Sequence, residues 1–242
     1  MELIKHQKVG SSIADPLANL SVMGIFQIAE EAVTELMGEL EIDDIVAKRE
    51  YNAVWVFAKS KTEIYKNIVW NEDYTVDCFI SKITRASISI DVGIKNKSDE
   101  LCSYTRVELC ALDLQSGRIR KVSTVGVDER MEIHIPLADM TFTKFDSEGL
   151  PEADTVKVKY TNIDFAGHTN NKEYIRFMLN TYSAQELQER PIREIEVVYI
   201  NQSFENDILT VHKGSFDDKD ILEVRKEDKP IVKCEIVRGD NG

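Results

Sequence analysis

The stretch VKYTNIDFAGHTNNKEYIRFMLN (residues 158–180) lies without a gap over VGSSIADPLANLSVMGIFQIAEE (residues 9–31), 149 residues earlier in the chain. Asp164 falls on Asp15, and the apolar positions that follow each turn coincide. In both copies a short apolar segment leads into a turn and then into an apolar helical run. Self-similarity at a fixed spacing predicts a duplicated structural unit.

A second pair of segments supports the duplication. IYKNIVWNED (64–73) resembles VYINQSFEND (198–207) when the two are set 134 residues apart, with Asp73 over Asp207. Because two blocks recur in the same order, we expect one fold to be used twice.

The boundaries of the two units follow from the repeat. We expect an N-terminal domain at residues 1–127 and a C-terminal domain at residues 154–242. The segment between them, 128–153, is less periodic and is expected to be a link.

Each unit is expected to contain one central helix. Residues 21–37 are apolar around most of the helical circumference, which indicates a helix wrapped by other structure. The second helix is expected at residues 171–182, with Asn170 as its N-cap and Glu173 completing a capping box. The repeat makes Ser21 the matching cap of the first helix.

The remaining periodic segments are typical of strands. They alternate apolar and polar residues or are rich in β-branched side chains. We therefore expect an α+β fold with two tandem domains, each a long helix wrapped by an antiparallel sheet. The expected strands are 54–59, 74–80, 87–94, 101–114, 194–200, 207–212, 220–226 and 230–237.

The composition limits the classes of partner. The 242-residue chain has a net charge of −13, and an acidic surface repels nucleic acid and anionic membranes. The first residues, MELIKHQKVG, lack the apolar run of a signal peptide, and no apolar run is long enough to cross a bilayer. We expect a cytoplasmic protein. The cysteines and histidines are scattered without metal-ligand spacing, so we expect buried thiols and no metal site.

The segment TNIDFAGHTNNKEYIRFML (161–179) resembles the signature of the acyl-acyl-carrier-protein (acyl-ACP) thioesterases, a bacterial and plant family with two hotdog domains in one chain. The usual pattern is Asp-x-Asn-x-His-Val-Asn-Asn, followed by Tyr-Ile. The resemblance continues in family order over TEIYKNIVWNEDYTV (62–76), YTRVELCALDLQSGRIRKV (104–122) and REIEVVYINQSFENDILTV (193–211).

This resemblance implies hydrolysis of a fatty acyl-ACP thioester to a free fatty acid, without metal or cofactor. Asp164, His168 and Gln202 are then the expected catalytic residues. Thioester hydrolysis requires an activated water and stabilisation of the developing oxyanion. A helix N-terminus offers unpaired amides for the second task.

The chain departs from the family pattern at two positions. Ala166 stands where the family has its catalytic Asn, and Gln202 stands where it has a second acidic residue. Gln202 can hold a water but cannot take its proton. The next residue, often Cys in plant members, is Ser203. Asp164 is therefore the base, or the protein is slow, or it has changed its function.

Other candidate contacts with the substrate are weaker. Asn170 and Asn171 are expected to shape the helix entrance next to the substrate. The resemblance gives the first domain the acyl pocket, so Met23 and Phe26 are candidates to line it; plain core packing explains them equally well. A homodimer is possible beyond the internal duplication.

Ordinary roles compete with each of these interpretations. Asp164 can be a turn residue, and His168 can be a surface or core histidine. Binding of an acidic carrier protein needs a local basic patch, although solvated surface charge explains most of its candidates. An acyl-CoA thioesterase on the same fold and a non-catalytic acyl-binding or sensor protein remain alternative functions. The candidate basic residues are Lys157, Lys159, Lys172, Arg176, Arg190 and Arg193.

Overall fold

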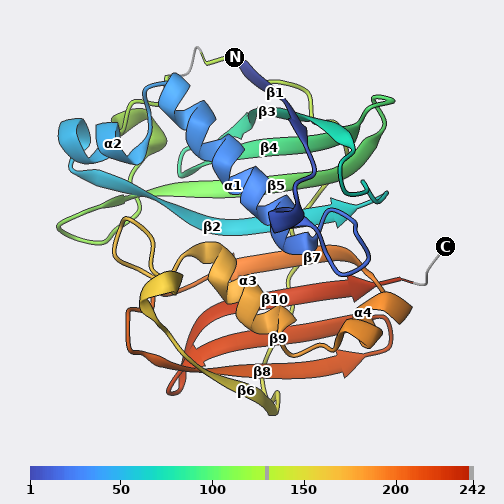
Figure 1. Cartoon of the computed structure of the whole chain (residues 1–242). Helices are drawn as coiled ribbons and strands as arrows, with labels where there is room; N and C mark the ends of the chain where they lie inside the picture. Colours follow the sequence, from blue (N-terminus) through green and yellow to red (C-terminus); the bar gives the residue numbers. More distant parts are fainter. Residues whose placement is uncertain (129–130, 240–242) are drawn as a thin grey trace. The chain divides into compact units, whose positions relative to one another are not determined.

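Each predicted central helix lies against antiparallel strands of its own unit in the computed structural model, which describes residues 1–128 and 131–239 (Figure 1). The chain divides into two units, Met1–Thr141 and Phe142–Gly242. Residues 129 and 130 of the expected link lie outside the described residues.

The first unit orders its strands β1-β3-β4-β5-β2, and every pairing within it is antiparallel. Helix α1 packs on β3 and β4. The elements are β1 (Glu2–Lys8), α1 (Val22–Glu39), α2 (Asp44–Tyr51), β2 (Ala53–Ile64), β3 (Asp73–Ile83), β4 (Ser87–Asn96) and β5 (Leu101–Asp113), with short 3-10 turns at Ser11–Ile13 and Val122–Thr124.

The second unit repeats this order as β7-β10-β9-β8-β6, again antiparallel throughout. Helix α3 packs on β9. The elements are β6 (Glu152–Lys157), a 3-10 turn (Tyr160–Asn162), α3 (Asn171–Leu179), α4 (Ala184–Glu189), β7 (Ile192–Tyr199), β8 (Ile208–Phe216), β9 (Lys219–Lys226) and β10 (Lys229–Arg238).

Helix α1 has the cap and the core face that the sequence predicts. The Ser21 hydroxyl accepts a hydrogen bond from the Gly24 amide at 2.9 Å, which satisfies one of the free amides of the first turn. Val33 and Leu36 are fully buried in the core of the first unit. The wide apolar face of α1 is needed because the strands curve around it.

Two short helices were not expected. Helix α4 begins with a capping box, in which Ser183 and Glu186 bind each other's backbone amides at 3.1 and 2.7 Å. This Ser-x-x-Glu signature was available in the sequence. Helix α2 is capped by Asp43, and it follows α1 closely.

The second repeated block is offset by 135 residues, and the predicted offset of 134 is wrong by one. Asn71 and Asn206 are the equivalent residues: both have positive φ, and both donate to the equivalent valine carbonyl, of Val9 and Val158, at 2.9 Å. The sequence comparison matched side-chain types, whereas the fold aligns backbone hydrogen bonds. Position 202 therefore corresponds to Asn67, not to Ile68.

Part of the expected link covers the outer face of the first unit. The Leu137 amide donates to the Tyr104 hydroxyl at 3.2 Å, and the His134 amide donates to the Ile80 carbonyl at 2.9 Å. Asp91 is fully buried beneath this segment and binds Arg106. Both faces of β4 are therefore buried, although its sequence alternates.

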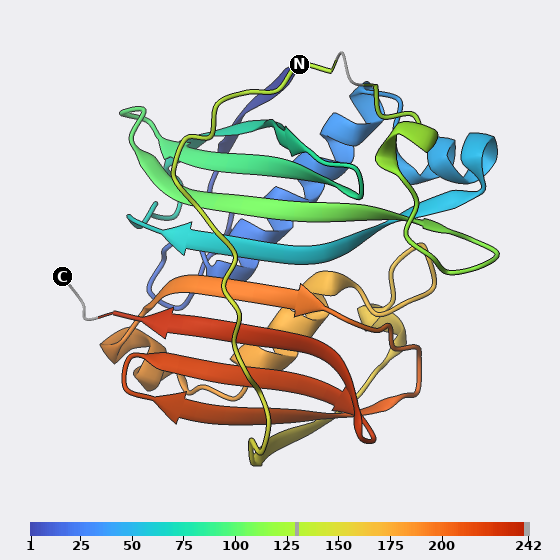
Figure 2. The same ribbon diagram turned by 180° about the vertical axis from the view of Figure 1, so that it is seen from behind.

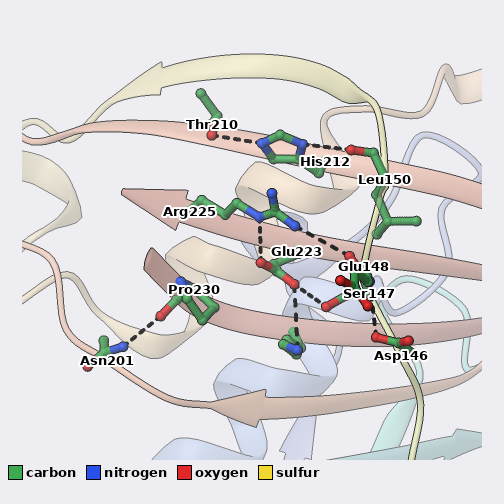
Figure 3. Close-up of polar contacts among 11 residues, drawn as sticks. Asp146, Ser147, Glu148, Leu150, Asn201, Thr210, His212, Glu223, Arg225 and Pro230 are labelled. Atoms are coloured by element: carbon green, nitrogen blue, oxygen red, sulfur yellow. Dashed lines mark hydrogen bonds and ion pairs between the residues drawn. The ribbon is translucent and has the colours of Figure 1, made fainter. Parts of the chain in front are cut away.

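The following residues cover the outer face of the second unit in the same way (Figure 2). The Thr143 amide donates to the buried Glu196 carboxylate at 2.9 Å. The Ser147 hydroxyl donates to Glu223, which also binds Arg225 (Figure 3). Buried carboxylates thus hold a segment that has no regular secondary structure of its own.

The cysteines behave as the sequence predicts, since Cys78, Cys102, Cys110 and Cys234 are all buried. Burial raises the pKa of the Cys234 thiol well above its ordinary value. None of the helices in the described ranges is long and apolar enough to cross a membrane.

Candidate active site

Asp164 and His168 are brought together by one tight turn before α3. The Asp164 Oδ1 accepts hydrogen bonds from the amides of Ala166 at 2.8 Å and His168 at 3.3 Å. The Asp164 amide donates to the His168 carbonyl at 2.9 Å, and Gly167 occupies the turn with φ +85°. The carboxylate thus binds the backbone of His168.

The first unit makes the same turn around Asp15. Its Oδ1 accepts from the amides of Leu17 and Asn19 at 2.9 and 2.8 Å. Because Asn19 stands at the position of His168, this turn is a property of the duplicated fold and does not require catalysis. In the second unit, formation of the turn accounts for both hydrogen bonds that Asp164 Oδ1 accepts. The Oδ2 atom has no hydrogen-bond partner within the described residues.

His168 is half-buried, and its ring packs edge-on against Phe204 with 5.3 Å between the ring centroids. Phe204 lies two residues after Gln202 in the segment that follows β7, and it is itself 48% exposed. The imidazole makes no hydrogen bond to another described residue. Its ring is therefore oriented by an aromatic contact, and its nitrogens remain available to a reactant.

A closed ring of hydroxyl groups joins the start of α3 to the segment after β7. Tyr174 accepts from the Ser203 amide at 3.0 Å, so its proton is directed to the Ser203 hydroxyl at 2.9 Å. Ser203 then donates to the Thr169 hydroxyl at 2.7 Å, and Thr169 donates to the Ser203 carbonyl at 3.1 Å. Ser203 is fully buried, and its proton is used, so it is a positioning residue.

Sequence reasoning noted all three residues but missed this ring. Thr169 and Tyr174 stand inside the quoted signature, and Ser203 follows Gln202. The ring pairs residues 34 and 29 positions apart, which no local pattern reveals.

Asn170 caps α3, as predicted, because its Oδ1 accepts from the Lys172 amide at 3.0 Å. The predicted capping box is wrong. The Asn170 amide donates to the Asn162 carbonyl at 2.8 Å, so it is not available to Glu173. The buried Glu173 carboxylate instead accepts from Asn162 Nδ2 at 2.9 Å and pairs with Arg176.

Asn171 is the first residue of α3, and its side chain is half-buried. Among the described residues, its amide has no hydrogen-bond acceptor. The cap therefore satisfies the Lys172 amide and leaves the Asn171 amide at the positive end of the helix dipole. An amide of this kind can stabilise an oxyanion.

The two positions that depart from the family pattern lie at the surface. Ala166 is exposed on the turn, and Gln202 is exposed next to the buried Ser203. Neither Gln202 nor Glu205 forms an ion pair or hydrogen bond with another described residue. The structure brings Gln202 to the same end of α3 as Asp164 through the Ser203–Thr169 contact.

Met23 and Phe26 lie one turn apart on α1. Met23 is half-buried, and Phe26 is 3% exposed. Phe26 lies outside the core cluster that includes Ile25 and Ile28. Among the described residues, no group of three or more His, Cys, Asp or Glu is placed to hold a metal ion.

Comparison with known proteins gives a family match for the second unit. Residues 147–237 match the model of the acyl-ACP thioesterase C-terminal domain. The second unit therefore resembles the C-terminal domain of the acyl-ACP thioesterases. This confirms the resemblance predicted from residues 161–179. No curated protein sequence matches the chain.

The solved structures show the fold of this family over the full chain. An acyl-ACP thioesterase from Bacteroides thetaiotaomicron is 16% identical, with a TM-score of 0.85 over 98% of both chains. The 12:0-ACP thioesterase from Umbellularia californica is 12% identical, with a TM-score of 0.86 over 99% of this chain and 98% of the other. The predicted α+β class with two tandem hotdog domains is confirmed.

Proposed function

We propose that this protein hydrolyses fatty acyl-ACP thioesters to free fatty acids and that the second unit performs the chemistry. The observation that carries the proposal is the turn before α3. In it Asp164 binds the His168 amide through Oδ1 and keeps Oδ2 without a hydrogen-bond partner among the described residues. The match of residues 147–237 to the acyl-ACP thioesterase C-terminal domain supports this reaction.

The proposed reaction assigns a step to each group. Asp164 Oδ2 accepts a proton from water as the water oxygen attacks the thioester carbonyl carbon. The carbonyl oxygen becomes negative and is stabilised by the Asn171 amide. The carbon–sulfur bond then breaks, and the departing sulfur receives the proton through His168. The products are a carboxylic acid and the carrier thiol.

Because Ala166 and Gln202 stand where the family has a catalytic Asn and a second acidic residue, fewer side chains are available to activate the water. Gln202 can orient the water through its amide, but it cannot remove a proton. Loss of one general base costs about 10²–10⁴-fold in rate, so we expect slower turnover than in a family member with both acidic residues. If Asp164 does not compensate, the remaining function is acyl binding.

A panel of acyl-ACP thioesters, from short to long acyl chains, tests the proposal. Free thiol release is measured for the wild type and for Asp164→Ala, alongside the corresponding acyl-CoA thioesters. We expect carrier thioesters to be preferred and Asp164→Ala to be nearly inactive. Tight acyl binding without thiol release would contradict hydrolysis and favour an acyl-binding protein. A preference for acyl-CoA thioesters would favour an acyl-CoA thioesterase.

The roles of the first unit belong to this proposal as well. We propose that residues 1–127 form the domain that holds the acyl chain, that 128–153 link it to the catalytic domain at 154–242, and that the reaction occurs in the cytoplasm. Met23 and Phe26 are the candidate acyl contacts. Replacing Met23 by Ala or Trp should move the preferred chain length in opposite directions, and an unchanged profile would remove it from the pocket. A homodimer stays a prediction.

A further inference from the structure

We propose that the surface around the start of α3 docks the acidic face of the carrier protein that delivers the thioester; this inference rests on the proposed function. We call this surface the α3-entrance patch. It consists of Lys157, Lys159, Tyr160, Phe165, Lys172 and Arg176.

Hydrogen bonds hold the patch together at the catalytic turn. The Lys159 amide donates to Asn162 Oδ1 at 2.9 Å, and Asn162 Nδ2 donates to Glu173 in the first turn of α3 at 2.9 Å. The Asn162 carbonyl accepts from the cap residue Asn170, which in turn binds the Lys172 amide. Lys159 and Lys172 are therefore on neighbouring segments at one end of the helix.

The side chains of the patch are exposed, except for the half-buried Lys172, and most of them are unpaired. Tyr160 is 81% exposed and Phe165 is 89% exposed, although both are large aromatic residues. Lys157, Lys159 and Lys172 form no ion pair with any described residue, whereas Lys66 and Lys95 in the first unit are paired with carboxylates. Exposed aromatic rings mark interaction surfaces, and unpaired cations beside them favour an anionic partner.

The internal duplication shows that the fold does not require this patch. Residues 157–176 hold four cations and two carboxylates, a net charge of +2 with histidine neutral. The equivalent residues 8–27 hold one cation and one carboxylate and are neutral. The same aspartate turn forms in both. The one equivalent cation, Lys8, pairs with Asp73.

Five of the six members of the patch have a neutral counterpart in the first unit. These five equivalent positions carry no charge and no aromatic ring; they are Gly10, Ser11, Pro16, Met23 and Gln27. Unpaired cations and exposed aromatic rings thus occur around the turn that holds His168. Around the turn that holds Asn19, Lys8 is paired and the aromatic Phe26 is buried. Function, and not folding, accounts for their position.

A carrier protein fits this surface better than a small anion does. A small anion is bound by buried, convergent donors, whereas Tyr160 and Phe165 project into solvent. Phe165 directly follows Asp164, so a protein docked here would present its thioester at the proposed catalytic carboxylate. Because the whole chain has a charge of −13, a local positive patch is also needed to attract an acidic partner.

The test compares charge reversal inside and outside the patch. Lys159→Glu/Lys172→Glu is compared with Lys144→Glu and Lys229→Glu, which are exposed lysines of the same unit outside the patch. An acidic residue at position 172 lies in the first turn of α3, where it stabilises the helix. Lys159→Gln/Lys172→Gln serves as a milder second variant, and the thermal midpoint confirms folding of each.

The measured quantity is the ratio of kcat/KM for one acyl group on carrier protein to kcat/KM for the same acyl group on pantetheine, which is uncharged. We expect this ratio to fall about tenfold or more in the patch variant and to fall with added salt in the wild type, because rim charges govern association. The control variants should keep the wild-type ratio. The acyl-CoA ratio is measured in parallel.

Two results would overturn the proposal. An unchanged carrier ratio in the patch variant would show that the patch does not dock the carrier. An equal loss for CoA would show that it binds phosphate groups only. If the wild type hydrolyses no thioester, the proposed function fails; binding of acyl carrier protein, measured by fluorescence anisotropy on the same variants, then decides the docking surface alone.

Discussion

Asp164 carries two carboxylate oxygens in different surroundings. Oδ1 accepts two backbone hydrogen bonds, and Oδ2 has no partner among the described residues. The turn-forming and catalytic interpretations of this residue therefore apply to different atoms. Asp15, which makes the same two contacts in the first unit, separates the two roles experimentally.

Replacement of Asp164 by Asn should keep the turn and lose the base. The amide oxygen can still accept from Ala166 and His168, so we expect the free energy of unfolding to change by less than about 1 kcal/mol. Thioester hydrolysis should fall by about 10²–10⁴-fold, since the amide cannot take a proton. Thermal unfolding and thiol release measure the two effects.

The matched control is Asp15→Asn, which changes the same atom in the unit without the histidine. It should keep the wild-type rate. Full activity in Asp164→Asn would show that this carboxylate is only a turn residue.

At the scale of elements, the hydroxyl ring fixes the start of α3 to the segment after β7. Removing the hydroxyl of fully buried Ser203 leaves Tyr174 without its acceptor and Thr169 without a donor. We expect Ser203→Ala to lower the free energy of unfolding by about 1–3 kcal/mol. Urea unfolding measures the loss.

A double-mutant cycle with Tyr174→Phe tests whether the ring acts as a unit. Residues in one network couple by about 0.5–3 kcal/mol. Additive losses from the two substitutions would contradict a closed ring, and complete loss of activity without loss of stability would make Ser203 a reacting group.

The start of α1 depends on a glycine for a different reason. A Cβ at Gly24 would lie 2.6 Å from the Ile13 carbonyl oxygen, in the backbone of the preceding turn. We expect Gly24→Ala to destabilise the protein by about 1–3 kcal/mol, because the turn and helix must separate.

Gly38, near the end of the same helix, is the comparison. There a Cβ would meet only Asp43 at 3.8 Å, and Ala is the better helix former, so Gly38→Ala should gain up to about 1 kcal/mol. Thermal midpoints of both variants rank them. Equal effects would show that the contact with Ile13 carries no cost.

On the scale of the whole molecule, stability should decrease in acid through a buried cluster of the second unit. Asp220 is 1% exposed and binds Tyr182 at 2.8 Å and Arg238 at 2.7 Å. Burial alone would raise its pKa, but hydrogen bonds from Ser215 and Tyr182 and the Arg238 charge outweigh burial and lower it.

The sign of the pH dependence follows from this lowered pKa. The folded state holds the proton less tightly than the unfolded state, so the stabilisation is present above the unfolded pKa of about 4. It is lost as the pH falls through the folded value. The thermal midpoint should therefore drop below about pH 4. Asp220→Asn should have a lower thermal midpoint than the wild type at neutral pH, and its midpoint should fall less in acid. If the midpoint of this variant falls as much as that of the wild type, other carboxylates cause the acid sensitivity.

The sequence predicted the elements whose signal is local. The caps Ser21 and Asn170, the apolar face of α1 and every expected strand are present, because periodicity and capping depend on neighbours within one or two turns. The capping box at Glu173 failed because Asn162, eleven residues earlier, takes both groups that the box requires. The repeat register failed by one residue for a similar reason, since backbone pairing outweighs side-chain likeness.

By itself the sequence determined the duplication, the α+β class and the resemblance to acyl-ACP thioesterases, since these depend on patterns along the chain. Only the tertiary structure decided which oxygen of Asp164 is free and that Ser203 is held in a closed ring. It also decided that buried carboxylates bind Thr143 and Ser147, which lie outside regular secondary structure. These features join residues far apart in the chain. Their contacts depend on how strands and helices pack, and hydrogen bonds at such distances leave no periodic signal in the sequence.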